Sequence, residues 1–289
     1  MEWINKKTIL IVGLGLMGGS YAMALKRLGY TVTAIDTDED SIDYAVNNSI
    51  IDRGSITADK DLIGAADAVV FALYPKTFVE WIDKYQQYLK PGIFITDVTG
   101  VKGCIVYKIQ DMLRSDVEFI ASHPMAGREV SGVKNSSDMI FRDANYIVVP
   151  TEKNTPQAVE WCMMLGRILG FRKISVLSPE EHDSMIAYVS QLTHCIAISL
   201  MTGTDLEHVE NFTGDSFRDL TRIARINENM WSELFHVNKE PLLKEMDLFI
   251  NELTQLRNLI DKDDQEAIKE KMRLSTKRRS KFNQNNKNK

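Results

Sequence analysis

The feature that most constrains this chain is a glycine-rich turn near its start, the sequence GLGLMG at residues 13–18, which has the spacing GxGxxG. An apolar run of strand character, Thr8 to Gly13, leads into the turn, and a stretch of helical character, Met17 to Leu28, follows it. In that setting the first glycine permits a tight turn, the second leaves room for a pyrophosphate beside the backbone, and the third lets helix and strand pack closely. The turn therefore predicts a dinucleotide site at the helix N-terminus rather than a turn without a ligand.

An acidic residue at the end of the next predicted strand indicates which dinucleotide binds. Asp36 follows Gly13 by 23 residues, which is where a carboxylate can accept hydrogen bonds from the adenosine ribose. Between Tyr30 and Ile51 the sequence has no Arg or Lys that could hold a 2′-phosphate. The alternative for Asp36 is a plain turn residue ahead of a helix. We expect NAD as the cofactor, with contacts from Gly13, Gly15, Leu16, Met17, Gly18, Asp36, Leu73 and Tyr74.

The first part of the chain alternates short apolar runs with amphipathic stretches as far as residue 177. Continuous apolar strands separated by helices are typical of a parallel sheet covered on both faces. We predict an α/β domain of Rossmann type over residues 1–177. Its predicted strands are 8–13, 31–36, 68–73, 92–98, 117–122, 145–149 and 173–177, and its first helices are 17–28 and 38–47.

After residue 177 the strand signal ends and helical patterns take over. Ser178 is placed to cap a helix, Pro179 suits the first helical position, and Glu181 completes a capping box. We predict an all-α domain over 178–282 that binds substrate and forms a homodimer, followed by a disordered basic tail at 283–289. The predicted helices are 179–203, 216–225, 228–237, 239–261 and 263–281.

Composition narrows the class of partner and the compartment. The formal net charge of −5 argues against a general polyanion binder. Six Lys or Arg and no acid lie between Thr276 and Lys289, which is typical of a solvated terminus rather than a nucleic-acid-binding arm. Cys104, Cys162 and Cys195 have no CxxC or metal-site spacing, which favours a reducing cytoplasm and no metal. We find no signal peptide and expect no membrane-spanning run.

A histidine near the carboxyl edge of the predicted sheet is the candidate for chemistry. Ligands of open α/β sheets bind outside the carboxyl ends of the strands, and His123 comes directly after the predicted strand 117–122. A neutral imidazole there can accept a hydroxyl proton near neutral pH. The alternative is a structural histidine that satisfies a local turn.

The segment around His123 resembles that of a known family. SHPMAGREVSG at 122–132 looks like the HPxxG segment of prephenate and arogenate dehydrogenases, and DVTGVKG at 97–103 is similar to the stretch that precedes it there. The order of the similar segments is also that of the family. The remaining segments are SPEEHD at 178–183, SQLTH at 190–194 and FRDLTRIA at 217–224 with Met230-Trp231.

The resemblance implies an activity and a set of site residues. It implies NAD-dependent oxidative decarboxylation of prephenate, or of its amino counterpart arogenate, on the route to tyrosine. It also implies that His123 contacts the ring hydroxyl and that Arg222 binds a substrate carboxylate, a group that a planar guanidinium can grip in two places. The other residues assigned to the substrate pocket are Ser122, Ser190, Gln191 and His194. The last three share one side of a helix, where the alternative is hydrogen bonding between helices.

Two positions depart from the family pattern. The family often has Ser at the position of Gly100, where it assists the catalytic histidine, and glycine cannot do this. Thr99 is our candidate for a compensating catalytic role. Many relatives have His at the position of Gln191, which puts that substrate contact in question.

Two other functions are compatible with the sequence. Hydroxyisobutyrate-type dehydrogenases and pyrroline-carboxylate reductases share the two-part plan, but they predict a catalytic lysine or a different helix motif in place of HPxxG. A dinucleotide-sensing protein without turnover belongs to another class, and Gly100 and Gln191 keep it open. Formation of reduced nicotinamide from prephenate and NAD discriminates among these functions.

Overall fold

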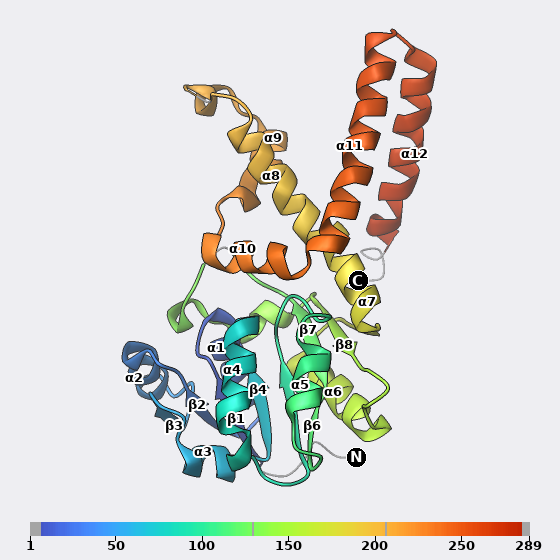
Figure 1. Ribbon diagram of the computed structural model, residues 1–289. Coiled ribbons are helices and arrows are strands. Elements are labelled where there is room, and N and C mark those ends of the chain that lie inside the picture. The colour runs from blue at the N-terminus through green and yellow to red at the C-terminus, as the bar shows by residue number, and fades with distance from the viewer. Residues whose placement is uncertain (1–6, 129, 206, 285–289) are drawn as a thin grey trace. The chain divides into compact units, whose positions relative to one another are not determined.

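The computed structural model describes residues 7–128, 130–205 and 207–284. Its contacts divide the chain into two compact units that meet between Lys239 and Glu240. The larger unit contains a six-stranded parallel sheet with the order β3-β2-β1-β4-β5-β6 (Figure 1), which is the order of the Rossmann dinucleotide-binding fold. The α/β prediction is therefore confirmed. The strands are β1 Thr8–Val12, β2 Thr31–Ile35, β3 Arg53–Ser55, β4 Ala68–Phe71, β5 Ile93–Asp97 and β6 Val117–Phe119.

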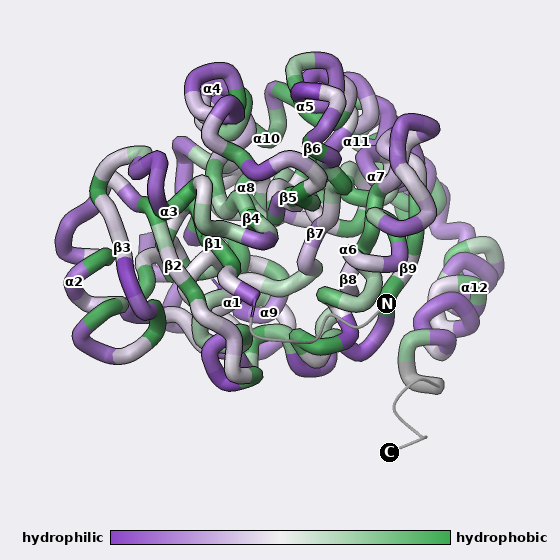
Figure 2. The backbone as a smooth tube through the Cα atoms, turned by 90° about the horizontal axis from the view of Figure 1, so that it is seen from below, coloured by the Kyte–Doolittle hydropathy of each residue, from purple (hydrophilic) through white to green (hydrophobic). Residues whose placement is uncertain are grey.

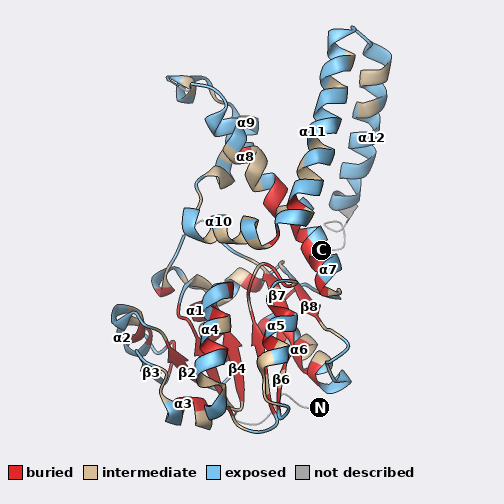
Figure 3. Cartoon of the chain, viewed as in Figure 1, coloured by how far each residue is buried: buried red, intermediate tan, exposed pale blue. Residues whose placement is uncertain are grey.

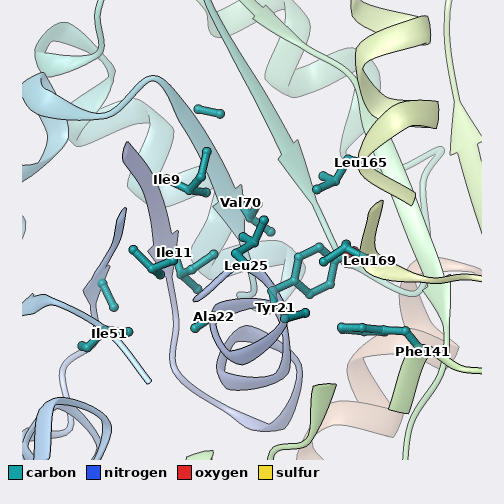
Figure 4. Close-up of a cluster of buried hydrophobic side chains, with 14 of the residues drawn as sticks. Ile9, Ile11, Tyr21, Ala22, Leu25, Ile51, Val70, Phe141, Leu165 and Leu169 are labelled. Carbon is teal, nitrogen blue, oxygen red and sulfur yellow. The ribbon is translucent and has the colours of Figure 1, made fainter. Parts of the chain in front are cut away.

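Two apolar layers sandwich this sheet, because successive residues of a strand point to opposite faces. Ile9 and Ile11 of β1 pack in one buried cluster with Tyr21 (Figure 4), whereas Leu10 packs in a second cluster with Phe78. Figure 3 shows the strands buried and the outer helix faces exposed, and Figure 2 shows hydrophobic and hydrophilic residues alternating along α4. The helices are α1 Leu16–Arg27, α2 Glu39–Asn47, α3 Lys60–Ala65, α4 Pro75–Tyr85, α5 Val106–Met112 and α6 Pro156–Leu169.

A second sheet corrects the expectation of one parallel sheet. The predicted strand 117–122 is divided at Ile120 between β6 and a separate strand, β7 Ala121–Met125. β7 pairs antiparallel with β8 Asn145–Val149, which pairs parallel with β9 Lys173–Val176. β7 is an edge strand, so it tolerates Pro124, which has no backbone N–H to donate. The short β3 was missed as well, because its sequence RGS lacks the apolar pattern of a strand.

The helices that follow β9 belong by contacts to the larger unit. They are α7 Pro179–Ile186, α8 Leu192–Thr202, α9 Asp215–Thr221 and α10 Glu228–Val237. The predicted helix 179–203 is interrupted by a π-helical turn at Ala187–Gln191, and the predicted helix 216–225 ends in a 3₁₀ turn at Arg222–Ala224. The capping box of Ser178 and Glu181 forms as predicted.

Among the described residues, one helical run, Pro179–Thr202, is long and apolar enough to span a membrane by length and composition, with a hydropathy of 1.3. The expectation that no run reaches that length was therefore wrong. The run carries His182, Asp183 and Gln191 as buried polar side chains. All three hydrogen-bond to other parts of the larger unit, as buried polar side chains of a folded protein do.

The smaller unit is a pair of helices, α11 Lys239–Asp261 and α12 Gln265–Gln284, joined by a short turn (Figure 1). Lys271 of α12 and Glu252 of α11 form an ion pair at 2.5 Å. Most residues of both helices are exposed (Figure 3). The basic tail predicted at 283–289 is corrected at its start, since α12 continues to Gln284, and residues 285–289 lie outside the described residues.

Candidate active site

The glycine-rich turn has the geometry that its spacing predicts. Gly13 has a φ of +96°, and a Cβ there would lie 2.4 Å from the carbonyl oxygen of Ala72. A Cβ on Gly18 would lie 1.8 Å from the carbonyl oxygen of Gly13, so both positions require glycine. Gly15 is different, because no atom lies within 4 Å of its Cβ position. The turn is therefore closed on the protein side and open at the residue where a pyrophosphate would approach.

The start of α1 fits an anionic ligand. Gly15 is the N-cap, no side chain caps the helix, and the first turn holds no acid. Leu16 and Met17 begin the helix with their first amides outside the helical ladder. These features suit the diphosphate of a dinucleotide.

Two further residues assigned to the cofactor lie after β4. Leu73 approaches the turn, with its Cδ2 atom 3.1 Å from the Cβ position of Gly13. Tyr74 is the N-cap of α4 and is exposed. The structure thus brings both to the edge of the sheet that carries the glycine turn.

Asp36 has a structural task that the sequence did not reveal. Its Oδ2 atom accepts a hydrogen bond from the backbone N–H of Leu14 at 2.5 Å, and its Oδ1 atom accepts one from Asp38 at 2.9 Å. The carboxylate therefore fixes the glycine turn from the neighbouring strand. It remains half-exposed beside that turn.

His123 lies within β7 rather than after a strand, opposite Ile147 of β8. Its Nδ1 atom is 2.9 Å from Nε2 of His182, and its side chain is half-buried. Burial lowers the pKa of His123 well below its ordinary value, and nearby His182 and Lys102 lower it further. The imidazole is thus neutral at neutral pH, as a general base must be.

His182 and Asp183 of α7 were missed as site residues. The Nδ1 atom of His182 is 2.7 Å from Oδ1 of Asp183. The two oxygens of Asp183 accept the backbone N–H groups of Lys102 and Gly103 at 2.8 and 2.7 Å. A histidine and a carboxylate side by side in SPEEHD are the available signal, but the segment by itself predicts a helix start. The contacts join residues 59 to 81 positions apart, which sequence spacing does not reveal.

A buried ion pair supports the loop after β5. The Nζ atom of Lys102 lies 2.6 Å from Oδ2 of Asp97 and donates to the carbonyl of Ser122 at 2.6 Å, with the side chains of the ion pair fully buried. Thr99 is buried too, and its hydroxyl contacts the same Asp97 carboxylate and accepts from Lys102. The structure thus holds this hydroxyl within the protein, and the catalytic role of Thr99 stays a prediction.

Ser122 also makes its contacts within the protein. Its hydroxyl donates to the carbonyl of Asp97 at 2.8 Å and accepts from the hydroxyl of Tyr146 at 2.7 Å. Ser122 is fully buried, and its predicted substrate contact stays a prediction. It supports β7 beneath His123.

The polar residues predicted to share one side of the helix around 190–194 make two different kinds of contact. Gln191 is buried, donates to the carbonyl of Leu234 at 3.0 Å and accepts from Asn238 at 2.7 Å. The structure shows the alternative, a bond between helices, and the substrate contact of Gln191 stays a prediction. The half-buried His194 stacks on Trp231 with ring centroids 3.7 Å apart, and its Nδ1 atom lies 2.9 Å from the carbonyl oxygen of Ser190.

The arginines after α8 are also distinguished by the structure. Arg218 of α9 pairs with Asp215 at 2.5 Å and donates to the carbonyl of Thr213. Arg222 lies in the 3₁₀ turn, which packs against α8, and it is exposed. Gly100 lies near the site histidine, since its Cβ position is 4.0 Å from Cε1 of His123.

A Rossmann sheet, an open glycine turn and a neutral histidine at the carboxyl edge of that sheet together define a dinucleotide-dependent oxidoreductase. Residues 21–174 match the family model described as the nucleotide-binding domain of prephenate dehydrogenase, and residues 178–274 match the model of its dimerization domain. The chain belongs to the prephenate dehydrogenase family.

Individual relatives agree with this membership. The chain is 32% identical to prephenate dehydrogenase of Bacillus subtilis over 91% of this chain and 72% of that one. It is 30% identical to cyclohexadienyl dehydrogenase of Zymomonas mobilis, over 94% and 95% of the two chains. A crystal structure of prephenate dehydrogenase from A. aeolicus in complex with hydroxyphenyl propionate and NAD⁺ superposes with a TM-score of 0.88 and 30% identity, covering 97% of this chain and all of that one.

Proposed function

We propose that this protein is an NAD-dependent prephenate dehydrogenase, which converts prephenate into 4-hydroxyphenylpyruvate and carbon dioxide on the route to tyrosine. The observation that carries the proposal is the neutral imidazole of His123, held through one nitrogen by His182 at the carboxyl edge of a dinucleotide-binding sheet. Family membership supports the substrate.

The proposed binding site for the cofactor is the open glycine turn. The amides at the start of α1, beginning at Leu16 and Met17, suit the diphosphate, and Gly15 leaves the space for it. Asp36 favours a free ribose hydroxyl, since no Arg or Lys stands between Tyr30 and Ile51 to neutralise a 2′-phosphate. We therefore expect NAD rather than NADP.

His123 is the catalytic base in this proposal. When bound, NAD supplies the acceptor for a hydride from the ring carbon that carries the hydroxyl. Nε2 of His123 accepts the hydroxyl proton as the C–O bond becomes a carbonyl-like bond. The ring carboxylate then departs as carbon dioxide, and the electrons of the broken C–C bond complete the aromatic ring. The oxygen that results is a phenolate, and the imidazolium of His123 can return the proton to it, which gives the phenol and restores the neutral base.

Arg222 is the proposed cation for a substrate carboxylate. Arg222 is exposed in a turn packed against α8, the helix of His194. A dianionic substrate needs such a charge, and a guanidinium binds carboxylates in a planar fork. His194 and Ser190 supply the neighbouring polar surface.

We also propose a homodimer, formed within the region 178–282 that we assign to substrate binding and assembly, after a nucleotide domain at 1–177. The smaller unit exposes Leu248, Ile250, Leu253, Ile260 and Met272 by more than half. Two helices with that much exposed apolar surface need a partner, and the family model for this region is described as a dimerization domain. Ile250→Glu should shift the protein toward monomer in light scattering, with Asn251→Glu as the charge-matched control. A wild-type monomer at micromolar concentration would contradict the dimer.

The direct test of the activity is the absorbance of reduced nicotinamide after prephenate and NAD are added to the purified protein. We expect turnover with NAD, and little with NADP. Arogenate, the alternative substrate, differs only in an amino group on the side chain and forms a parallel assay. Wild-type protein without turnover on either substrate would contradict the proposal, and His123→Asn controls for contaminating activity.

A further inference from the structure

One nitrogen of His123 is committed to the protein and the other is not. Nδ1 lies 2.9 Å from Nε2 of His182. Within the described ranges, no hydrogen-bond partner contacts Nε2 of His123. A neutral imidazole carries its proton on one nitrogen and its lone pair on the other. Whether the free nitrogen can accept a proton therefore depends on the tautomer.

The partners of His182 decide that tautomer. An ionised carboxylate only accepts hydrogen bonds, so Nδ1 of His182 must donate to Asp183, 2.7 Å away. The Nε2 atom of a neutral His182 then carries a lone pair and can only accept. The bond to His123 consequently requires the proton on Nδ1 of His123, which leaves the lone pair on its Nε2 atom.

The carboxylate at the end of this chain is itself fixed. Asp183 accepts the backbone N–H groups of Lys102 and Gly103, and its own carbonyl accepts from Asn238 at 3.0 Å. Its carboxylate therefore has little freedom to rotate, and it joins α7 to the loop after β5. An anchored acceptor of this kind holds a histidine in one orientation.

The electrostatic surroundings favour neutral rings. The charged and titratable groups that face the two histidines are Lys102, Asp97 and Asp183. Burial lowers the pKa of His182, and Asp183 opposes part of that effect. The directions of the hydrogen bonds from His123 to His182 and from His182 to Asp183 require a neutral His182.

We propose that His182 and Asp183 are positioning residues that hold His123 with Nδ1 protonated and with Nε2 ready to accept the substrate proton. The identity of that proton rests on the proposed function, but the tautomer is a property of the free protein. The pair fixes the ring through Nδ1, whereas Gly100, whose Cβ position lies 4.0 Å from Cε1, has no side chain that could do so.

The first experiment is a ¹⁵N NMR spectrum of the full chain labelled at histidine, in which bare and protonated ring nitrogens have distinct shifts. His123→Asn assigns the signals. We expect His123 with protonated Nδ1 and bare Nε2 near neutral pH. His182→Leu should abolish the single tautomer, whereas His182→Gln should retain it, because a glutamine oxygen can accept from Nδ1. His236→Leu removes an exposed imidazole and serves as control.

Kinetics give a second measurement. His182→Leu should lower kcat roughly 10- to 100-fold with the KM for NAD unchanged, and His182→Gln should recover most of the loss. A wild-type His123 protonated at Nε2 would overturn the proposal, as would a His182→Leu protein with unchanged tautomer and kcat. If His182→Leu fails to fold, the wild-type and His182→Gln spectra still decide. A wild type with the expected spectrum but no turnover would overturn the proposed function alone.

Discussion

The dinucleotide end of the candidate site is built from backbone, whereas the reacting end is built from side chains. At the first, Gly13, Gly15 and Gly18 shape a turn within six residues, and contact is made by amides and empty space. At the second, His123 of β7 and His182 of α7 are in contact although they lie 59 positions apart in the sequence. The difference teaches that a motif can specify a cofactor site locally, while a catalytic group depends on how distant elements pack. Substitutions at the two ends should therefore fail in different ways.

The largest effect should follow loss of the base at the reacting end. His123→Asn should lower kcat by roughly 10²–10⁴, with the KM for NAD unchanged, because the dinucleotide turn is built separately. Steady-state rates with prephenate and NAD measure this. An equal loss of NAD binding would break the comparison, since it would mean that the two ends are one structure.

At the dinucleotide end, substitutions of two glycines should have different consequences. One should weaken NAD binding, and the other should destabilise the fold. Gly15 has a φ of −69°, which other residues adopt, so Gly15→Val should fold and raise the KM for NAD about tenfold or more, through lost contacts worth roughly 1.5–3 kcal/mol. Gly18→Ala should lower the free energy of unfolding by about 1–3 kcal/mol, since its Cβ meets the Gly13 carbonyl. Thermal melts and NAD titrations of both variants separate the two consequences; a stable Gly18→Ala protein would refute the packing argument.

A smaller effect is expected for Arg222, which at the reacting end is proposed to bind the substrate and not to take part in the chemistry. Arg222→Ala should raise the KM for prephenate roughly 10- to 100-fold with a lesser change in kcat, because a charged hydrogen bond is worth about 1.5–3 kcal/mol before the transition state. Arg218→Ala is the matched control, since that side chain pairs with Asp215. Equal effects of the two substitutions would contradict the assignment.

The pH dependence sharpens the contrast further. The folded pKa of His123 is lowered, so kcat/KM should stay level above about pH 6.5 and fall only as pH drops through that lowered value. Stability has the same sign, because below about pH 6.5 the unfolded chain binds protons that His123 and His182, whose pKa values are lowered in the folded protein, do not. The free energy of unfolding should therefore decrease as pH falls below about 6.5, and less so in His123→Gln. An acidic limb centred above pH 7 would exclude His123 as the base.

The smallest effect is expected at Gly100. A Cβ there would lie 3.7 and 3.8 Å from Leu234 and 4.0 Å from His123, all ordinary contacts. Gly100→Ser should therefore fold normally and change kcat by no more than about threefold, upward if its hydroxyl reaches the imidazole. A tenfold loss of activity would mean that this space is needed for the substrate or the cofactor.

The sequence predicted the dinucleotide half more fully than the reacting half. The glycine-rich turn, the Rossmann-type α/β class and the helix starts follow from local patterns. The helix α7, for example, begins at Ser178 and Pro179 as expected. The hydrogen-bond partners of Ser122 and Gln191 could not be predicted, because they lie 25 and 47 positions away in the sequence. The partners of Thr99 are close in sequence, but that local pattern does not reveal that its hydroxyl is buried against Asp97 and Lys102. The second sheet was missed because the apolar pattern of β8 predicts a strand but not the strand with which it pairs, here the antiparallel β7.

The convergence of His123 and Arg222 on one substrate is the central claim, and a crystal structure of this protein with NAD and hydroxyphenyl propionate tests it most directly. We predict Nε2 of His123 within hydrogen-bonding distance of the phenol hydroxyl and the guanidinium of Arg222 against the carboxylate of the same molecule. A ligand bound beside the cofactor that touches neither group, or only one of them, would contradict the account.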